Sequence, residues 1–435
     1  MSNKLTGHIP SQTSNLTHLK LLQVVSNRLQ GQIHSSIIEL KKLQFLDLGS
    51  NNLSGLVELE VFFHKLKSLR ALQLSANNLS VVTKTTTTTT LQKFILIGLS
   101  SCNLSEFPNF LQNQHRLLVL DLSFNRIAGK IPEWFLKASN FKALKSLNLS
   151  HNLLTGFDQN PVVLPWSDLQ GCRFFQLSII DLSRNRFTGK LPSKYFQCWN
   201  AMKAINASGL IYMEDTLSLI LSFLFSYDGI YDYSLTLSNK GMEMEYQKVS
   251  NLLSGIILSS NRFTGEIPAS MANLKGIHVL DLSNNSLRGR IPSSLDDFKE
   301  LESLDLSNNR LSGKIPQQLV DLTSLGFINV SDNSLTGRIP QGTQFETFNS
   351  SSFDGNIGLC GRPLSEKCED DEASKKKIKD TGTESSFAFD WRVVALMGYG
   401  IGLIIGVALG ITFVDSKWFA LIFRRQLQRL KRKSG

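Results

Sequence analysis

The sequence has none of the short motifs that mark common catalytic centres. It contains no HExxH metalloprotease motif, no GxSxG nucleophile elbow and no Walker phosphate-binding loop, and its seven histidines are scattered. The five cysteines include no Cys-x-x-Cys pair, which argues against a metal site. The 21 residues that follow the last apolar run are too few for a kinase domain. We therefore expect no enzyme, no cofactor and no metal.

The start of the chain lacks a secretory signal peptide. Residues 1–10 already resemble the second half of a repeat unit. We therefore expect a chain or gene model that is incomplete at its N-terminus. The alternative is that export depends on a later apolar segment.

Positive charge is concentrated at one end of the chain. The formal net charge is +10, and residues 415–435 hold seven Lys or Arg against Asp415, a net of +6. This tail directly follows an apolar run, as the basic cytoplasmic flank of a membrane span does. Membrane topology explains the excess better than nucleic-acid binding, so we expect no nucleic-acid partner.

A repeat dominates the chain. Asn261, Asn285, Asn309 and Asn333 are each 24 residues apart, and the clearest unit, 301–316, reads Leu-x-x-Leu-x-Leu-x-x-Asn-x-Leu-x-Gly-x-Ile-Pro. Looser copies carry the same position at Asn27, Asn51, Asn77, Cys102, Asn125, Asn152 and Asn185. Counting the opening fragment, about twelve units are legible. One unit cannot bury its own leucines, so the units must stack into a solenoid with a continuous core.

The strand of each unit is expected to have two different faces. Leu304 and Leu306 are two residues apart, so both point from a short strand into the core. Asp305, Ser303 and Ser307 are then expected to face solvent on the concave side. On this interpretation Asp281 and Asp305 form a solvated ladder and not a general acid–base pair.

The turn of each unit is set by polar and special residues. Asn309 should bond its amide to backbone groups that stacking would otherwise leave unpaired. Gly313 permits a tight bend, and Pro316 fixes φ and stops the strand ladder. Cys102, which replaces the asparagine in one unit, should be a buried thiol. These regular positions are structural, so function is expected at the solvent-facing positions between them.

Three features carry a resemblance to a known family. The half-repeat Leu-x-Gly-x-Ile-Pro at 335–340 is similar to the plant-specific repeat subclass. The period breaks between Asn185 and Asn261, and the insert ends in 231–246, which resembles the island of plant receptor-like proteins. Segment 353–364 resembles their C-terminal cap. The chain is therefore identified as similar to kinase-lacking leucine-rich-repeat receptors, the family of the Cf-type immune receptors.

The resemblance implies the architecture. We expect an α/β leucine-rich-repeat solenoid, curved, with a parallel β-sheet on its concave face, and a single transmembrane α-helix. The expected parts are N-terminal repeats 1–198, an island 199–250, four repeats 251–342, a cap 343–368, a charged extracellular juxtamembrane segment 369–392, a transmembrane helix 393–414 and a basic cytoplasmic tail 415–435.

The membrane segment carries a regular glycine pattern. Residues 393–414 are 22 residues without a charge, about 33 Å as a helix, enough to cross a bilayer. Glycines four apart share one helical face and allow close helix packing in lipid, so we expect an interface with a partner helix at Gly398, Gly402, Gly406 and Gly410. The alternative is that glycine is simply common in membrane helices.

The expected topology is single-pass type I in the plasma membrane, with the repeats outside. The basic tail supports this orientation. Nine Asn-x-Ser/Thr sequons precede the span and are candidate glycosylation sites: Asn15, Asn52, Asn78, Asn103, Asn148, Asn206, Asn284, Asn329 and Asn349.

The remaining four cysteines form two pairs that are close in sequence. Cys360 and Cys368 flank the cap and are expected to form a disulfide that closes the last repeat. Cys172 and Cys198 lie about one repeat apart, so a bridge between them is possible but left open. An odd number of cysteines leaves at least one thiol unpaired.

The resulting functional hypothesis is a receptor for an extracellular peptide or protein ligand. The family resemblance implies a receptor kinase paired through the membrane helix, a co-receptor kinase recruited by ligand, and a role in plant defence more than in development. Candidate contacts are aromatic and charged residues that the core does not need: Tyr231, Tyr233, Lys240, Glu243, Glu245, His278, Glu302 and Phe327. Alternatives are a developmental peptide receptor, a membrane-free inhibitor of secreted wall-degrading enzymes and a non-functional truncated copy.

Overall fold

The computed structural model describes residues 4–83, 92–137, 141, 143–157, 176–196, 199–203, 235–246, 253–342 and 344–368. The chain divides into two compact units, Met1–Cys368 and Glu369–Gly435. None of the described residues belongs to a helix that is both long and apolar enough to cross a membrane. The expected span at 393–414 and its glycines lie outside the described residues.

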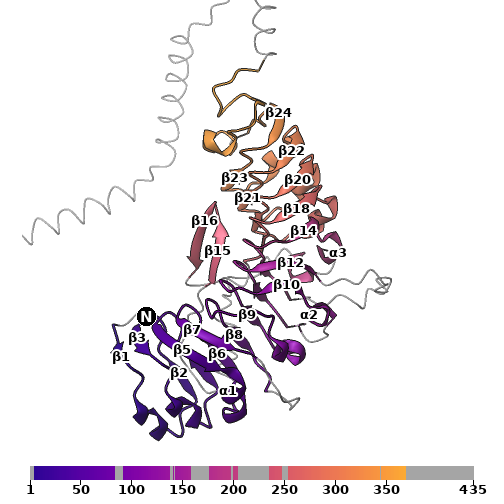
Figure 1. Cartoon of the computed structure of the whole chain (residues 1–435). Coiled ribbons are helices and arrows are strands. Elements are labelled where there is room, and N and C mark those ends of the chain that lie inside the picture. Colours follow the sequence, from indigo (N-terminus) through magenta and orange to yellow (C-terminus); the bar gives the residue numbers. More distant parts are fainter. Residues whose placement is uncertain are drawn as a thin grey trace, which may run out of the picture. The chain divides into compact units, whose positions relative to one another are not determined.

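One strand from each repeat joins a single parallel sheet in the first unit (Figure 1). Its 11 strands are β2 (Leu21–Gln23), β4 (Phe45–Asp47), β6 (Ala71–Gln73), β8 (Leu96–Gly98), β9 (Val119–Asp121), β11 (Ser146–Asn148), β13 (Ile179–Asp181), β17 (Gly255–Ile257), β19 (Val279–Asp281), β21 (Ser303–Asp305) and β23 (Phe327–Asn329). The strand order follows the sequence order. The solenoid expectation is confirmed for the described repeats.

The insert does not interrupt this sheet. β13 pairs directly with β17 in parallel register, with Ile180 opposite Ile256. The asparagine that recurs once in each repeat forms a ladder of hydrogen bonds along the stack, which we call the asparagine ladder. This ladder also crosses the gap, because the Asn261 side-chain amide donates to the Leu182 carbonyl at 2.9 Å. The chain therefore leaves the solenoid after one repeat and rejoins it at the next.

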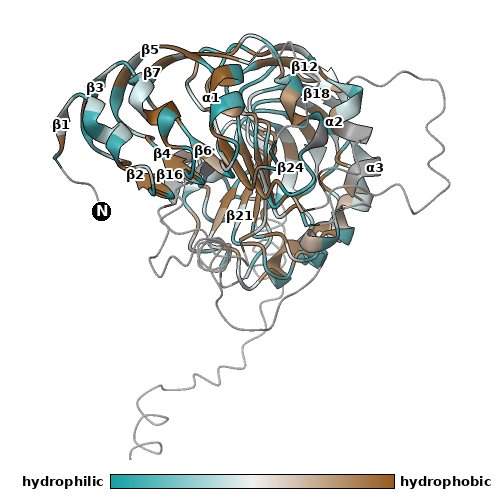
Figure 2. Ribbon diagram, turned by 90° about the horizontal axis from the view of Figure 1, so that it is seen from below, coloured by the Kyte–Doolittle hydropathy of each residue, from teal (hydrophilic) through white to brown (hydrophobic). Residues whose placement is uncertain are grey.

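A second set of strands was not expected from the sequence, which predicted one strand per repeat. Residues between the ladder asparagine and the following glycine form short parallel strands of their own (Figure 2). They are β1 (Thr6–Gly7), β3 (Arg28–Gly31), β5 (Asn52–Glu58), β7 (Asn78–Val82), β10 (Ala128–Ile131), β12 (Leu153–Phe157), β14 (Thr188–Lys190), β18 (Arg262–Gly265), β20 (Ser286–Gly289), β22 (Arg310–Gly313), β24 (Ser334–Arg338) and β25 (Gly358–Cys360). Gly313 ends β22 at a φ of 80°, which only glycine adopts freely, so the chain turns there after running extended beside the next repeat.

The remaining side of each repeat is helical, but mostly in tight 3₁₀ form. The short helices are η1 (Ser11–Asn15), η2 (Ser35–Glu39), η3 (Asn109–Asn113), η6 (Asn200–Met202), η7 (Ala269–Asn273), η8 (Ser293–Asp297), η9 (Gln317–Asp321) and η10 (Ser350–Ser352). Three α-helices are α1 (Leu59–Lys65), α2 (Glu133–Lys137) and α3 (Ser193–Phe196). Pro268, Pro292 and Pro316 directly precede η7, η8 and η9 with φ near −65°, which starts each helix and ends the preceding extended segment.

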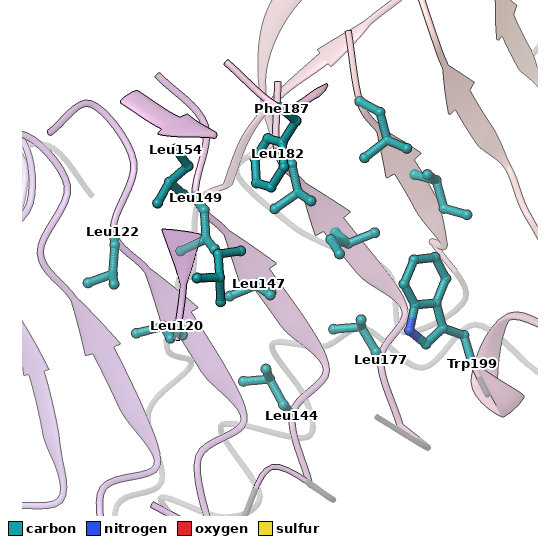
Figure 3. Close-up of a cluster of buried hydrophobic side chains, with 14 of the residues drawn as sticks. Leu120, Leu122, Leu144, Leu147, Leu149, Leu154, Leu177, Leu182, Phe187 and Trp199 are labelled. Atoms are coloured by element: carbon teal, nitrogen blue, oxygen red, sulfur yellow. The ribbon is translucent and has the colours of Figure 1, made fainter. Parts of the chain in front are cut away.

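The leucines of successive repeats form one core, part of which Figure 3 shows. Leu304 and Leu306 are fully buried, as the strand pattern predicted. Cys102 is also fully buried and has no disulfide partner. Burial raises the pKa of its thiol to about 12, so it stays protonated and unreactive at neutral pH.

The expectation that Asp305 and its serine neighbours face solvent was wrong. Asp305, Ser303 and Ser307 are all buried. The Asp305 carboxylate folds back onto its own turn, where it accepts the Ser307 N–H at 3.0 Å and the Ser307 hydroxyl at 2.6 Å. The equivalent side chains of the two adjacent repeats, Asp281 and Asn329, flank it on either side. The aspartates form a buried ladder and not a solvated one.

Burial changes the titration of these carboxyl groups. Burial raises the pKa of Asp181 to about 7; hydrogen bonds with Ser183 oppose this, and Asp281 and Asp121 reinforce it. Burial and the nearby Asp281 carboxylate raise the pKa of Asp305 to about 6. Both values lie above the ordinary 3.8, so the folded state binds protons more tightly than the unfolded state. Their stabilising contribution is complete below about pH 4 and is lost as pH rises through 6 to 7.

The whole repeat solenoid should therefore be more stable in mild acid. We expect the thermal midpoint of the full chain to be higher at pH 5 than at pH 8, by about 2–5 °C. Asp181→Asn should reduce this difference, because the amide cannot titrate. A midpoint that is equal or lower at pH 5 would contradict the raised pKa values.

The last repeat is closed by the cap. Asn356 takes the ladder position, although the sequence comparison within the chain missed it: its amide donates to the carbonyls of Val330 and Phe353, at 2.9 and 3.0 Å. Phe353 is fully buried beneath it. Cys360 and Cys368 form the expected disulfide. Residues 353–360 thus form a half-repeat that covers the end of the core.

Candidate functional site

The described part of the island is a β-hairpin. β15 (Leu235–Asn239) pairs in antiparallel register with β16 (Met242–Tyr246). The two turn residues, Lys240 and Gly241, have φ of 54° and 71°. Positive φ at both central residues is typical of the tight turns that match the twist of a hairpin. The turn therefore places the exposed side chains of Lys240 and Met242 at its tip.

This hairpin lies against the 11-stranded sheet, next to the four repeats that follow the island (Figure 1). β15 contacts β19, and the turn reaches two repeats further to Phe327 on β23. A Cβ added to Gly241 would lie 3.8 Å from the Phe327 Cζ atom. An island segment and a strand about 85 residues later thus share one surface.

The sequence-predicted residues on the repeats form a short row beside the hairpin. The Glu302 N–H donates to the His278 carbonyl at 2.9 Å, and the Gly326 N–H donates to the Glu302 carbonyl at 2.9 Å. His278 is half-buried, with Nδ1 3.1 Å from the Ser254 hydroxyl oxygen, whereas Glu302 is exposed. Phe327 follows Gly326 and is half-buried. We call Lys240, Met242, His278, Glu302 and Phe327 the hairpin surface.

The other candidate residues are only partly covered by the structure. Tyr231 and Tyr233 lie outside the described residues. Glu243 and Glu245 belong to β16, opposite Ser238 and Thr236, but their side chains are not among those described. Met242 was missed by sequence reasoning; the Asn-Lys-Gly turn that precedes it was the available signal.

A second exposed feature was also missed. The residue before each ladder asparagine has positive φ and is small or polar in most repeats, but one repeat has Phe124 there and the next has His151. Their rings stack with centroids 3.8 Å apart, and 42% of Phe124 is exposed. Positive φ is strained for a bulky residue. The sequence signal was an aromatic ring, in Phe124 and His151, at a position that elsewhere holds Ser, Ala, Asn, Asp or, in one repeat, Arg184.

The sequons differ in accessibility. Six of them are exposed: Asn15, Asn52, Asn78, Asn103, Asn284 and Asn349. Asn329 is half-buried, and Asn206 lies outside the described residues. Asn148 is buried on β11, where its Oδ1 accepts the Ser150 N–H at 3.0 Å. The expectation of a glycan at Asn148 was wrong, because the folded sheet leaves no room for one.

The described residues contain no group of three His, Cys, Asp or Glu side chains that could hold a metal. Cys172 and Cys198 lie outside these residues. The chemistry of the hairpin surface is that of recognition, because it combines an aromatic ring, a thioether, a cation and an anion on one exposed face.

The chain is similar in sequence to known leucine-rich-repeat proteins. Models of the leucine-rich repeat match residues 116–138, 176–198 and 251–311. Receptor-like protein 33 of Arabidopsis thaliana is 45% identical over 320 residues, which cover 73% of this chain and 34% of that protein. Receptor-like protein 53 of the same plant is 35% identical over a region covering 86% of this chain and 52% of that protein. The chain spans about a third to a half of the length of these curated relatives.

Solved structures show the same fold. The ectodomain of the plant membrane receptor kinase GASSHO1/SCHENGEN3 from Arabidopsis thaliana, crystallised with CASPARIAN STRIP INTEGRITY FACTOR 2, has a TM-score of 0.55 at 24% identity and covers 84% of this chain and 41% of that one. The structure of a TDR receptor has a TM-score of 0.50 at 25% identity, over 80% of this chain and 54% of that one. Both similarities extend over most of the repeats.

Proposed function

Because the chain belongs to the leucine-rich-repeat receptor-like proteins of plants, we propose that it is a cell-surface receptor for an extracellular peptide or protein. It would bind this ligand at the hairpin surface and signal through partner receptor kinases in plant defence. The membrane helix at 393–414 would hold one kinase partner, and ligand would recruit a co-receptor kinase. Neither proposal requires catalytic residues in this chain.

A single observation carries the ligand site: the island hairpin reaches Phe327 across two repeats. Insertions in a solenoid are most often surface loops on the binding face. Here the insertion brings exposed Lys240 and Met242 beside a half-buried aromatic ring and the exposed Glu302. Aromatic residues next to charged ones form the energetic centre of many protein interfaces.

The first test removes the hairpin surface from an otherwise intact receptor. Lys240→Ala, Met242→Ser and Phe327→Ala in one chain should shift the ligand concentration for half-maximal response by at least about 30-fold, since loss of one central aromatic contact costs about 2 kcal/mol. The measurement uses plant cells that express the full chain and an extracellular fraction that evokes a response dependent on it.

The matched control makes the corresponding changes on other repeats, with a leucine in place of the methionine: Lys42→Ala, Leu56→Ser and Phe124→Ala, all exposed positions. Its dose–response curve should be that of the unaltered chain. The control also tests the Phe124–His151 stack as a rival surface. If the hairpin variant reaches the normal surface level and responds fully, the ligand does not bind at the hairpin surface.

The second test concerns the proposed membrane partner. Gly402→Ile with Gly406→Ile should reduce co-precipitation of the partner kinase about tenfold, because bulk on the glycine face separates the two helices. Insertion and surface level should be unchanged, since isoleucine inserts readily into the bilayer.

Leu403→Ile with Val407→Ile places the same residue one position around the helix and should leave the association intact. If both pairs lose the partner equally, or if association survives deletion of 393–414, the glycines do not carry the interface.

A further inference from the structure

The second sheet of the last repeats carries a row of positive charge on its solvent side. The row lies on β18, β20, β22, β24 and β25 and on the first or second residue after these strands. We call it the basic ladder: Arg262, Arg288, Arg290, Arg310, Lys314, Arg338 and Arg362, all of them exposed. Glu266 is the only acidic residue on these strands and their following residues. The ladder is on a different sheet from the hairpin surface.

The stems of these side chains are held by the backbone of the next repeat. A Cβ added to Gly313 would lie 3.3 Å from Cγ of Arg290, and one added to Gly337 would lie 3.2 Å from Cγ of Lys314. Arg338 lies in the same way over Gly361, at 3.4 Å. Glycine thus leaves space for each aliphatic stem, and the charged ends are spaced by neighbouring strands, about 4.8 Å apart.

Two charges of the ladder face each other directly. Arg288 and Arg310 are opposite each other in the parallel register of β20 and β22. Like charges opposite each other destabilise a sheet. Across the ranges that the structure describes, neither of them forms an ion pair, and the same holds for Arg290 and Lys314. Because this repulsion does not stabilise the fold, the row favours a role in binding.

The repeat itself does not require the charge. At the equivalent positions on β3 and β5 and after them, Arg28 is the single cation, and Gln30, Gln32, Asn52, Ser54 and Leu56 are neutral. These strands form the same kind of parallel pair, in which Gln30 lies opposite Asn52. The fold therefore accepts neutral residues at positions where the last repeats hold cations.

We propose that the basic ladder binds a linear acidic polysaccharide, one whose sugar rings carry carboxylate groups. A line of cations along the stack matches a line of regularly spaced anions, and arginine pairs with carboxylates through two parallel hydrogen bonds. The exposed hydroxyls of Thr264, Ser312 and Thr336 alternate with the cations and suit the hydroxyl groups of sugars.

The surface fits a polysaccharide better than it fits a protein or a nucleic acid. Protein interfaces have an apolar or aromatic centre, whereas the solvent side of these strands has a single large exposed apolar residue, Ile357, at its last turn. Single-stranded nucleic acids are held by aromatic rings on which the bases stack, and no aromatic residue belongs to the exposed side chains of these five strands.

The test compares two variants that each lose four positive charges. The ladder variant carries Arg288→Gln, Arg290→Gln, Arg310→Gln and Lys314→Gln. The control variant carries Lys42→Gln, Lys65→Gln, Lys67→Gln and Lys299→Gln, all exposed and on other surfaces. The full chain in detergent micelles is titrated with polygalacturonate, with its methyl-esterified form, with polyglutamate and with single-stranded DNA, and thermal midpoints verify the fold of both variants.

We expect the unaltered chain to bind polygalacturonate and to ignore the esterified form. The ladder variant should bind at least about tenfold more weakly and with a smaller salt dependence, while the control should stay within about twofold. Equal losses of affinity in both variants would show that polygalacturonate binds through non-specific charge attraction and not at the basic ladder. Binding of polyglutamate or DNA as tight as that of polygalacturonate would overturn the assignment to a polysaccharide, as would a failure of the unaltered chain to bind.

Discussion

Leu304→Asp should abolish folding of the whole repeat solenoid. Asp305→Asn, one residue further along β21, should leave the thermal midpoint of the solenoid nearly unchanged. Leu304 is fully buried between the leucines of the adjacent repeats, with Leu280 and Ile328 opposite it in register. A carboxylate at this place would have neither water nor a partner. Burying an unpaired charge costs several kcal/mol, about the whole stability of many domains.

Asp305→Asn is mild for a reason that the chain itself provides. Asn148 and Asn329 occupy the same position in other repeats, and the Oδ1 of each accepts the N–H of the serine two residues later, at 3.0 and 3.1 Å. An asparagine at 305 keeps this acceptor and removes a carboxyl whose pKa burial has raised to about 6. Thermal unfolding followed by circular dichroism separates the two variants. Similar midpoints for both would show that the assignment of the strand faces is wrong.

Asn309→Leu should destabilise the repeat unit nearly as much. The Asn309 amide donates to the carbonyls of Leu282, Leu306 and Ser307 at 3.0 to 3.2 Å, and its Oδ1 accepts the Leu287 N–H at 3.0 Å. Leucine would leave four backbone groups without this partner inside the stack. Each unsatisfied group costs about 1–3 kcal/mol, so the loss should reach several kcal/mol.

The neighbouring residue provides the control. Asn308 is exposed, has a φ of 49° and bonds to the side chain of Asn284 at the surface. Asn308→Gly keeps the positive φ available and should change the free energy of unfolding by less than about 1 kcal/mol. Denaturant unfolding measures both changes. A loss from Asn308→Gly as large as that from Asn309→Leu would mean that the turn backbone, and not the asparagine ladder, holds the repeats together.

The parts of the fold that the sequence predicted are those fixed by one repeat and its copies. The positions of Leu304, Asn309 and Cys102 follow from periodicity, because a stacked unit has a single way to bury them. The cap disulfide followed from the family resemblance. The exposure of Asp305 was predicted wrongly, because the two-residue period of a strand predicts only the direction of a side chain. It does not predict whether hydrogen bonds and neighbouring repeats cover that side chain.

The site was harder to predict, since it depends on contacts between distant segments. The aromatic and charged residues of the island could be recognised, but their distance from Phe327 depends on where the insert returns to the solenoid. The second strands escaped prediction because they are two to seven residues long and their pattern merges with the turn. The sequence shows Phe124 and His151 as aromatic residues at a repeated position, but it does not show that their rings stack.

Photo-cross-linking from position 327 tests the proposed ligand site most directly. With p-benzoylphenylalanine at this position in the full chain, the reactive ring should attach to the hairpin turn, because the Phe327 Cζ atom lies 3.8 Å from the place of a Gly241 Cβ. Mass spectrometry should find the tryptic peptides 241–248 and 315–338 joined. Adding the extracellular fraction that evokes the response should replace this product with an adduct to a foreign peptide. A product joined only to other repeats, or one that the active fraction leaves unchanged, would contradict a ligand site at the hairpin surface.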